Sequence, residues 1–199
     1  MSANSYLDKI ERRKLENAKV GIAGAGGLGS NAAMLFVRAG LKNLVIADFD
    51  IVEESNLNRQ FFVSSQIGQK KTAALAENLC AIESRLNLEL HDVRLTRGNI
   101  ADVFAGCQII VEAFDSAQAK SMLLEELLPL GKTVISASGL AGWGRSNEII
   151  TRRVGKNLIL VGDQKSDVRD NLPPVGVRVM IAAAHEANAV CSLLLGEEL

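Results

Sequence analysis

Short apolar runs and longer stretches of helical period alternate along most of this 199-residue chain. The apolar runs are rich in residues that favour strands, and they cover residues 20–24, 44–48, 88–93, 108–113 and 133–138. The stretches between them predict helices at about 28–40, 69–84, 98–105 and 116–130. We therefore expect an α/β fold: a doubly wound, mostly parallel, Rossmann-like sheet with helices on both faces.

The pattern changes after Ser138. The stretch "GLAGWGRSN" predicts a Gly-rich loop, and "EIITRRVGKNLILVGD" predicts two strands around residues 154–157 that we expect to be antiparallel. The Ala-rich segment 177–199 predicts a helix that packs on the sheet and ends near Gly196. We predict a single domain over residues 1–199, with residues 1–18 as an N-terminal helical arm, because this length is short for two cores.

The charges are nearly balanced, with 22 Lys and Arg residues against 23 Asp and Glu residues. Because no overall field would draw the chain to a polyanion, nucleic acid and membrane surfaces are not expected as partners. The first 20 residues lack the apolar core of a signal peptide, and no uninterrupted apolar run reaches about 18 residues. A cytoplasmic location is the resulting expectation.

Three cysteines, Cys80, Cys107 and Cys191, lie far apart in the sequence. Their odd number and wide spacing fit a reducing compartment better than a disulfide framework. No two of them form a CxxC pair, and three thiolates cannot make a four-cysteine zinc site. A mixed metal site with His91 or His185 stays open, although no spacing supports it.

A Gly-rich turn, "GAGGLGS", directly follows the first predicted strand. At such a turn, backbone N–H groups approach phosphates at the positive N-terminus of the next helix. Asp48 ends the second predicted strand, where an acidic residue can hold ribose hydroxyls. These features predict a nucleotide site. The alternative is that the glycines only permit tight packing of the helix on the sheet.

Two features distinguish this turn from that of an NAD-dependent dehydrogenase. Gly27 adds a glycine to the usual GxGxxG spacing. After Asp48, "FDIVEESNLNRQFF" is polar and charged where a dehydrogenase would return to a helix. Loops of this composition on a rigid sheet typically serve binding.

Taken together, the stretch from Lys19 to Lys71, with "SNLNRQ" and "GQKK", and the later "VEAFDSAQAK" at 111–120 resemble the ThiF/MoeB family of adenylyltransferases. These enzymes are related to ubiquitin-activating enzymes and activate the C-terminus of ubiquitin-like sulfur-carrier proteins. The resemblance implies ATP and Mg²⁺ as cofactors, a ThiS-like carrier protein as partner and a homodimer. Thiamin biosynthesis is one pathway that such a carrier would serve, and neither the carrier nor the pathway follows from the sequence.

The resemblance also implies roles for individual residues. Asp48 would hold the ribose, and Asp115 would ligate magnesium. Asn56, Arg59 and Lys71 would hold the phosphates, with Ser55 and Asn58 as less specific matches. The nucleotide backbone would meet the glycines of the turn, which are Gly24, Gly26, Gly27 and Gly29.

In the implied reaction, the carrier's terminal carboxylate joins AMP and pyrophosphate leaves. A C-terminal carboxyl has a pKa of about 3.5, so the nucleophile is already ionised and no general base is required. The obstacle is electrostatic, since two unit charges 4 Å apart repel by roughly 4 kcal/mol at an effective dielectric constant of 20. Arg59, Lys71 and a magnesium ion on Asp115 would offset that repulsion. The chain has two histidines and neither a GxSxG motif nor a Cys/His pairing, which argues against a hydrolase.

Each of these side chains also has a purely structural alternative. Asp115 could cap the helix that starts near Ser116, Lys71 could be a solvated surface residue, and Arg59 could form a structural ion pair. Asp163 fits either a turn or a polar contact near the carrier tail.

Two further features stay open. The loop around Trp143 fits either the wall of a channel for a Gly-Gly tail or a surface loop. His185 is expected to pack or to cap in its Ala-rich helix.

The chain departs from longer family members in two respects. It lacks their zinc-binding CxxC pairs, and Cys191 lies in an apolar helix that favours a small buried side chain over a thioester or persulfide carrier. We therefore expect adenylation without a covalent cysteine intermediate. The family's N-terminal arginine, which reaches the other subunit's ATP, has no clear counterpart, and Arg12 or Arg13 could substitute for it.

Three other functions remain open at this point. A related enzyme could adenylate another acyl group, such as one on tRNA. The chain could instead be an NAD-dependent oxidoreductase. It could also be a non-catalytic module that keeps only the carrier-binding surface.

Overall fold

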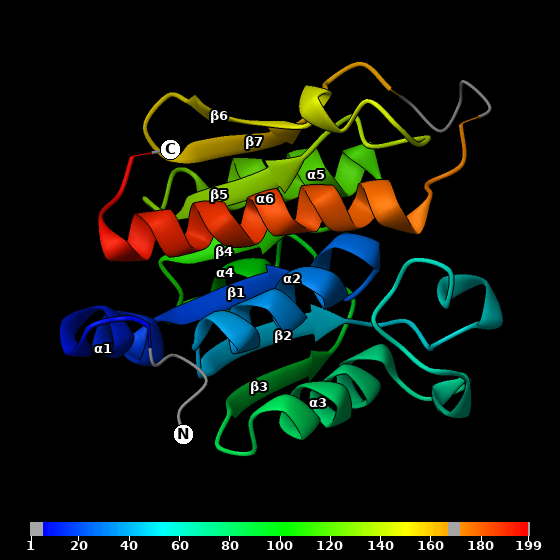
Figure 1. Ribbon diagram of the computed structural model, residues 1–199, viewed down its shortest axis with the longest axis horizontal. Coiled ribbons are helices and arrows are strands. Elements are labelled where there is room, and N and C mark those ends of the chain that lie inside the picture. Colours follow the sequence, from blue (N-terminus) through cyan, green and yellow to red (C-terminus); the bar gives the residue numbers. More distant parts are fainter. Residues whose placement is uncertain (1–5, 167–171, 199) are drawn as a thin grey trace.

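The computed structural model describes residues 6–166 and 172–198, which form a seven-stranded sheet (Figure 1). The strands are β1 (Lys19–Ala23), β2 (Asn43–Asp48), β3 (Asn87–Asp92), β4 (Ile109–Glu112), β5 (Thr133–Ala137), β6 (Ile150–Val154) and β7 (Leu158–Gly162). Their order across the sheet is β3-β2-β1-β4-β5-β7-β6. Only β6 is antiparallel to its neighbour β7; all other strand pairs within the described residues are parallel. The predicted α/β fold and its antiparallel pair are confirmed.

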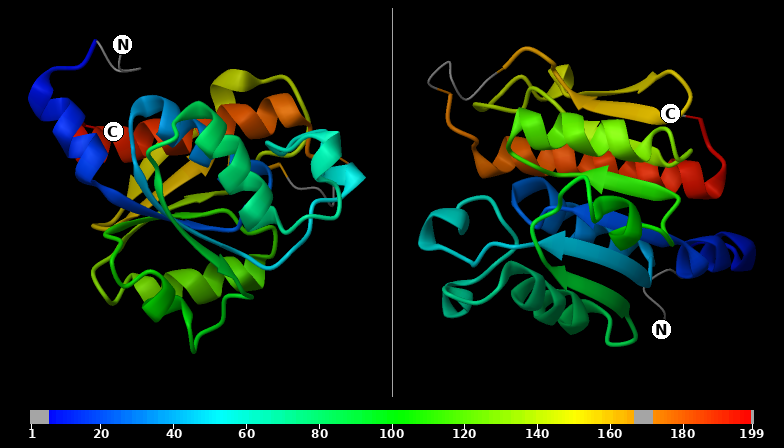
Figure 2. Two further views of the ribbon diagram at one scale, coloured as in Figure 1. Left: turned by 90° about the horizontal axis from the view of Figure 1, so that it is seen from below. Right: turned by 180° about the vertical axis from the view of Figure 1, so that it is seen from behind.

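Helices cover both faces of the sheet, as Figures 1 and 2 show. α2 (Gly27–Ala39), α3 (Lys71–Ile82) and α6 (Gly176–Leu195) lie on one face. α4 (Ile100–Val103) and α5 (Ala117–Leu127) lie on the other. α1 (Lys9–Asn17) falls within the predicted N-terminal arm, and Asp8 caps it. The described residues also form three short 3₁₀ helices that the sequence did not predict: η1 (Glu54–Asn56), η2 (Ser64–Gln66) and η3 (Ser146–Glu148).

Each face of the sheet has its own hydrophobic core. In β1, Val20 and Ile22 lie in the core beneath α2 and α6, whereas Ala23 lies in the core beneath α4 and α5. The central strands read as continuous apolar runs because both of their faces are covered. At the sheet edge, β3 has no fully buried residue.

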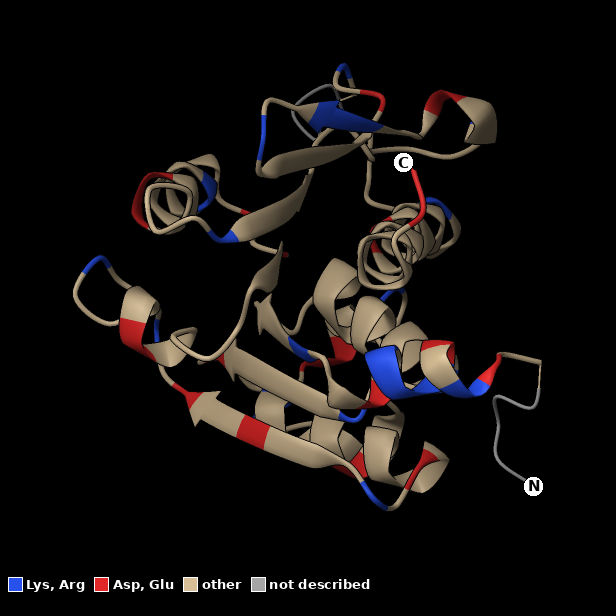
Figure 3. Ribbon diagram, turned by 90° about the vertical axis from the view of Figure 1, so that its left-hand side faces the viewer, with Lys and Arg blue, Asp and Glu red and all other residues tan. Residues whose placement is uncertain are grey.

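α6 begins one residue before the predicted start and ends at Leu195, where Gly196 adopts a left-handed conformation with φ of 88°. Among the described residues, it is the one helix long and apolar enough to span a membrane by length and composition. Here it lies along α2 and contacts β5, β6 and β7. Charged residues of both signs are scattered over the ribbon, consistent with the balanced composition (Figure 3).

The strand order reverses between β1 and β4, which lie side by side although β2 and β3 come between them in the sequence. In open α/β sheets, a crevice forms at such a reversal, outside the carboxyl ends of the strands. The Gly-rich turn follows β1 at this edge. The fold therefore places the turn where such sheets bind ligands.

Candidate functional site

The Gly-rich turn is shaped by close backbone contacts. Gly24 has φ of 101°, in the left-handed region, and a Cβ on it would lie 2.9 Å from the carbonyl oxygen of Ala113. A Cβ on Gly29 would lie 1.8 Å from the carbonyl oxygen of Gly24. Tight packing thus accounts for Gly24 and Gly29. It does not account for Gly26, where a Cβ would approach only the side-chain nitrogen of Gln60, at 3.8 Å.

The N-terminus of α2 opens at this turn. Gly26 is the N-cap residue, and no side chain caps the helix. The first backbone N–H groups of a helix have no partner within the helix, and they favour an anion. The turn therefore offers uncapped donors next to a glycine that leaves room for a close approach.

Asp48 lies beside the turn at the end of β2. One carboxylate oxygen accepts a hydrogen bond from the backbone N–H of Ala25 at 2.6 Å, and the other accepts from that of Asp50 at 2.8 Å. The sequence predicted a ribose contact for Asp48 and missed this bracing of the turn. Each oxygen keeps a second lone pair for a ligand hydroxyl.

Arg59 lies against the start of α2. The side-chain amide of Asn31 donates to the carbonyl oxygen of Arg59, and the Ser30 hydroxyl accepts from the backbone N–H of Phe61. The guanidinium donates to the carbonyl oxygen of Ser55 and to the side-chain oxygen of Asn58. No carboxylate pairs with it among the described residues, so the predicted alternative of a structural ion pair finds no support there.

Lys71 is the first residue of α3 and is only 6% exposed. The alternative that it is a solvated surface residue is therefore wrong. Its ammonium pairs with Asp50 at 3.0 Å, and Asp50 in turn bonds to Asp48. A chain of contacts thus links Lys71 to the Gly-rich turn.

Asn56 and Ser55 shape the loop that carries Arg59. The side-chain oxygen of buried Asn56 accepts from the backbone N–H of Glu53, and its nitrogen donates to the Ser55 hydroxyl. Ser55 is exposed and donates to the Glu53 carboxylate. In this structure both side chains hold the loop, and their contacts with phosphate remain predictions.

Asp115 follows β4 and is exposed. Ser116, and not Asp115, caps α5 by accepting from the backbone N–H of Ala119, so the predicted alternative of a cap at Asp115 is wrong. Within the described part of the chain, Asp115 has no hydrogen-bond or ion-pair partner. The backbone N–H of Ala113, two residues earlier, donates to the carbonyl oxygen of Ala23, directly before the Gly-rich turn, so the segment that carries Asp115 passes beside the turn.

The side chains at the turn fit a magnesium ion only if a nucleotide supplies the other ligands. No group of three or more His, Cys, Asp or Glu side chains among the described residues could hold a metal. Magnesium in nucleotide sites is typically bound by one or two carboxylates together with phosphate oxygens. Asp115 supplies such a carboxylate, so the residues fit a metal that arrives with a nucleotide.

Sequence reasoning missed a buried cluster behind Asp115. The Glu112 carboxylate is fully buried and accepts hydrogen bonds from Lys120, from the Ser136 hydroxyl and from the backbone N–H of Phe114. These contacts anchor the segment that carries Asp115. A charged residue at the end of an apolar run, with a lysine eight positions later, was the available signal.

Asp163 forms a second buried cluster. One oxygen accepts from the backbone N–H groups of Lys165 and Ser166, which confirms the turn interpretation, and the other pairs with Arg178 at 2.6 Å. Burial pushes the pKa of Asp163 up, but these N–H groups and Arg178 outweigh it and lower the pKa to about 2. Asp163 also borders a hollow beside β6. The side chain of Trp143 is 63% exposed to solvent.

The remaining candidates lie outside the turn. His185 bonds to Thr151 of β6, consistent with the packing role expected for it. Burial raises the pKa of the Cys191 thiol, and it raises that of Cys107 to about 11, so neither favours a thiolate.

Arg12 and Arg13 lie on α1, which precedes β1 and is therefore at the opposite end of that strand from the turn (Figure 1). Within one chain they do not lie near it. The predicted role of either arginine in a second subunit's site stays a prediction.

Comparison with known families and curated proteins gives consistent results. A family described as the ThiF family matches residues 3–198. The adenylyltransferase and sulfurtransferase UBA4 of Eremothecium gossypii is 37% identical over 133 residues, which cover 66% of this chain and 30% of that protein. The probable adenylyltransferase/sulfurtransferase MoeZ of Mycobacterium tuberculosis is 30% identical over 128 residues, covering 64% of this chain and 33% of MoeZ. The chain thus spans about a third of the length of these relatives.

Solved structures share the fold. Escherichia coli TcdA, a tRNA N6-threonylcarbamoyladenosine dehydratase solved in complex with AMP, superposes with a TM-score of 0.86 at 17% identity, over 94% of this chain and 90% of that one. Escherichia coli MccB, solved with ATP, superposes with a TM-score of 0.73 at 19% identity, over 94% of this chain and 59% of that one. At these identities the likeness concerns the fold alone.

Proposed function

The chain belongs to the ThiF family, and we propose that it is an ATP-dependent adenylyltransferase. Its substrate is the C-terminal glycine carboxylate of a ThiS-like, ubiquitin-like carrier protein, which becomes an acyl-adenylate as pyrophosphate leaves. One observation carries the proposal: the start of α2 has no side-chain cap, and the segments that carry Arg59 and Asp115, neither of which has an ion-pair partner among the described residues, both meet the Gly-rich turn. The names of UBA4 and MoeZ as adenylyltransferases support it.

Binding comes first in the proposed mechanism. The N–H groups at the start of α2 and the guanidinium of Arg59 hold the phosphates, and Asp48 accepts hydrogen bonds from the ribose. Lys71, which pairs with Asp50 in this structure, also holds phosphate oxygens when the nucleotide is bound. Asp115 would hold a magnesium ion, which would supply positive charge to offset the negative charge of the triphosphate.

The chemical step needs no general base. The carrier carboxylate is ionised at neutral pH, and its oxygen attacks the α-phosphorus while the bond to the bridging oxygen of pyrophosphate breaks. Arg59 stabilises the charge that develops on the leaving group because it is positioned before the reaction. In-line placement of the carboxylate opposite the leaving pyrophosphate contributes the rest of the rate acceleration.

Among the finer features of the proposal, the carrier and the homodimer rest on the family, and the cytoplasmic location rests on the sequence composition. We propose a homodimer in the cytoplasm and a carrier that serves thiamin biosynthesis or another sulfur-transfer pathway. Membership in the family favours adenylation over the NAD-dependent alternative. Two alternatives remain: an enzyme that adenylates an acyl group on tRNA, and a non-catalytic module that only binds the carrier. The experiment must distinguish both from the proposed function.

Carrier-dependent ATP/pyrophosphate exchange tests the proposal. The wild-type protein is expected to catalyse exchange with a ubiquitin-like protein that ends in Gly-Gly. Arg59→Ala should lower the rate by at least about a hundredfold, since that is the scale of losing one positioned transition-state donor. Asp115→Ala should also lower it, while circular dichroism stays unchanged.

The matched control is Arg153→Ala, because Arg153 is an exposed arginine on β6. It should exchange at the wild-type rate. Full activity of Arg59→Ala would refute the assigned site. Exchange that required tRNA would point to another acyl substrate, and ATP binding without any exchange would favour the non-catalytic module.

A further inference from the structure

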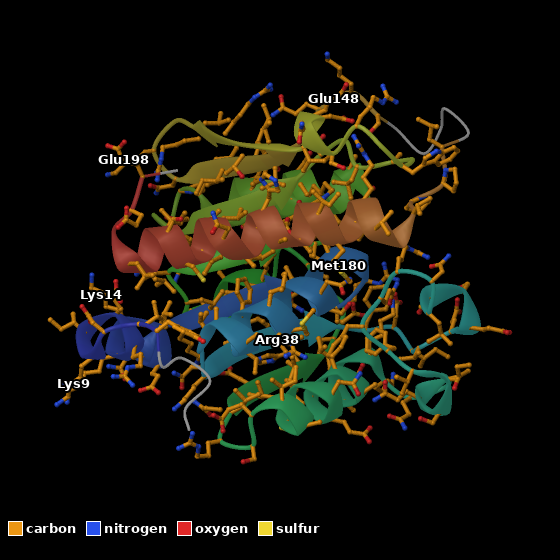
Figure 4. All side chains as sticks on the ribbon, in the orientation of Figure 1. Lys9, Lys14, Arg38, Glu148, Met180 and Glu198 are labelled. Atoms are coloured by element: carbon orange, nitrogen blue, oxygen red, sulfur yellow. The ribbon has the colours of Figure 1, made fainter. Side chains whose placement is uncertain are left out.

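The first turn of α6 touches the candidate nucleotide site directly. A Cβ on Gly176 would lie 2.4 Å from the carbonyl oxygen of Asn58 and 3.3 Å from Cα of Arg59. One turn later, Val179 lies 3.0 Å from the Cβ position of Gly27. Figure 4 labels Met180, the next residue, beside the start of α2. This helical turn therefore forms a wall against which the segment of Arg59 rests.

Arg178 lies in the same turn and is only 2% exposed. Its guanidinium pairs with Asp163 at 2.6 Å and donates to the carbonyl oxygens of Gly144 and Arg145 at 2.5 and 3.1 Å. A buried guanidinium is costly to desolvate, and bonds to a carboxylate and two carbonyls offset that cost only in a defined geometry. The side chain thus ties α6 to the end of β7 and to the Gly-rich loop after β5.

That loop has little intrinsic preference for one shape. Gly139, Gly142 and Gly144 all have positive φ, as does Arg145. Glycine populates such conformations readily, so its freedom must be removed by contacts. These contacts include the bonds from Arg178, one from the backbone N–H of Gly142 to the carbonyl oxygen of Pro173, and one from the backbone N–H of Asp163 to the carbonyl oxygen of Gly139.

We propose that Arg178 is a positioning residue for the nucleotide site. It clamps the first turn of α6 between the loop 139–145 and the segment of Arg59, so that Arg59 is fixed before the nucleotide arrives. Arg178 does not touch the substrate and acts through Arg59. The inference rests on the proposed role of Arg59 in holding phosphates.

A double-mutant cycle on ATP affinity tests this coupling. Calorimetry with ATP and magnesium would compare the wild type, Arg178→Met, Arg59→Ala and the double variant. We expect Arg178→Met to weaken ATP binding by about tenfold in the native background and by less than about twofold in the Arg59→Ala background, because coupled residues are not additive. Equal effects in both backgrounds, or none in either, would overturn the inference.

Controls separate positioning from general stability. Arg97→Met removes an exposed arginine that pairs with Glu125 and Glu126 on α5, and it should leave ATP affinity unchanged. Arg178→Lys keeps the charge and loses the planar fork, so its affinity should fall between those of the wild type and Arg178→Met. If Arg178→Met does not fold, Asp163→Asn replaces it in the cycle with the same expectation.

Trp143 provides a second readout, because it is the chain's only tryptophan and lies in the anchored loop. Arg178→Met should alter its emission maximum or its quenching by acrylamide, whereas Arg97→Met should not. Unchanged emission would contradict the anchoring of the loop. The two proposals also fail differently. If the effects of Arg178 and Arg59 on ATP affinity are coupled but no pyrophosphate exchange occurs, only the proposed adenylation is refuted. If exchange occurs but the two effects are additive, only the role of Arg178 is refuted.

Discussion

At the scale of single residues, several charged side chains serve the fold and the candidate site together. Asp48 braces the Gly-rich turn and keeps lone pairs free for a ligand, while Lys71 is buried and paired with Asp50. Glu186 is different. It is fully buried on α6, and neither of its carboxylate oxygens has a hydrogen-bond partner among the described residues.

Burial raises the pKa of Glu186 well above its usual value of 4.5; Lys120 opposes the shift and the Glu112 carboxylate adds to it. The folded state therefore holds a proton that the unfolded state loses as the pH rises above 4.5. In that window, folding stability falls with pH by up to about 1.4 kcal/mol per unit.

Glu186→Gln should remove this pH dependence, since an amide does not titrate. Urea unfolding at several pH values between 4 and 8 would show a flatter profile for the variant, with the largest difference at the highest pH. Glu54→Gln, at an exposed position, should follow the wild type. A variant profile as steep as the wild-type one would show that Glu186 is ionised in the folded protein.

At the scale of elements, the contact between β1, the Gly-rich turn and α2 depends on the absence of a side chain. The carbonyl of Gly24 occupies the space of a Cβ on Gly29, and this carbonyl belongs to the turn that we propose holds phosphates. A methyl group at residue 29 would push the helix away from the strand.

Gly29→Ala should therefore destabilise the fold by about 1–3 kcal/mol, the usual cost of overpacking, and should abolish ATP binding. Urea unfolding and calorimetry would measure the two effects. Gly98→Ala is the matched control, because its Cβ would meet only the Thr96 hydroxyl, at 3.8 Å. Native ATP affinity in Gly29→Ala would mean that the turn tolerates displacement.

At the scale of the whole molecule, α6 connects the parts of the sheet. It lies along α2 on one side and contacts β5, β6 and β7 on the other, and Lys14 of α1 donates to the carbonyl oxygen of Leu195 near its end. The single domain remains a prediction, which these contacts support.

We expect one cooperative unfolding transition as a consequence. Trp143 reports on the loop after β5, and far-ultraviolet circular dichroism reports on all the helices. Their urea transitions should coincide, as in a two-state domain. An earlier fluorescence transition would identify the β5 to β7 region as a separate unit.

The local pattern was sufficient to predict the strands and the longer helices, while the candidate site residues other than Asp48 came from the family resemblance and stay predictions. Predicted helix 69–84 is observed as Lys71–Ile82, because apolar periodicity survives errors at the ends. Predicted helix 98–105 is only four residues long, Ile100–Val103. The structural alternatives for Lys71 and Asp115 were wrong because burial and capping depend on neighbours that the local sequence does not identify.

By itself, the sequence determined the alternating strands and helices, the Gly-rich turn after β1 and the choice of Asp48 as a candidate, since each depends on periodicity or on a short motif. The resemblance to the ThiF/MoeB family added Arg59, Lys71 and Asp115 as candidates. Tertiary structure alone decided which charges are paired. Glu112 meets Ser136 from the neighbouring strand, and Asp163 meets Arg178 across an intervening segment. Such pairs depend on strand order and helix packing, which bring together residues that no local pattern relates.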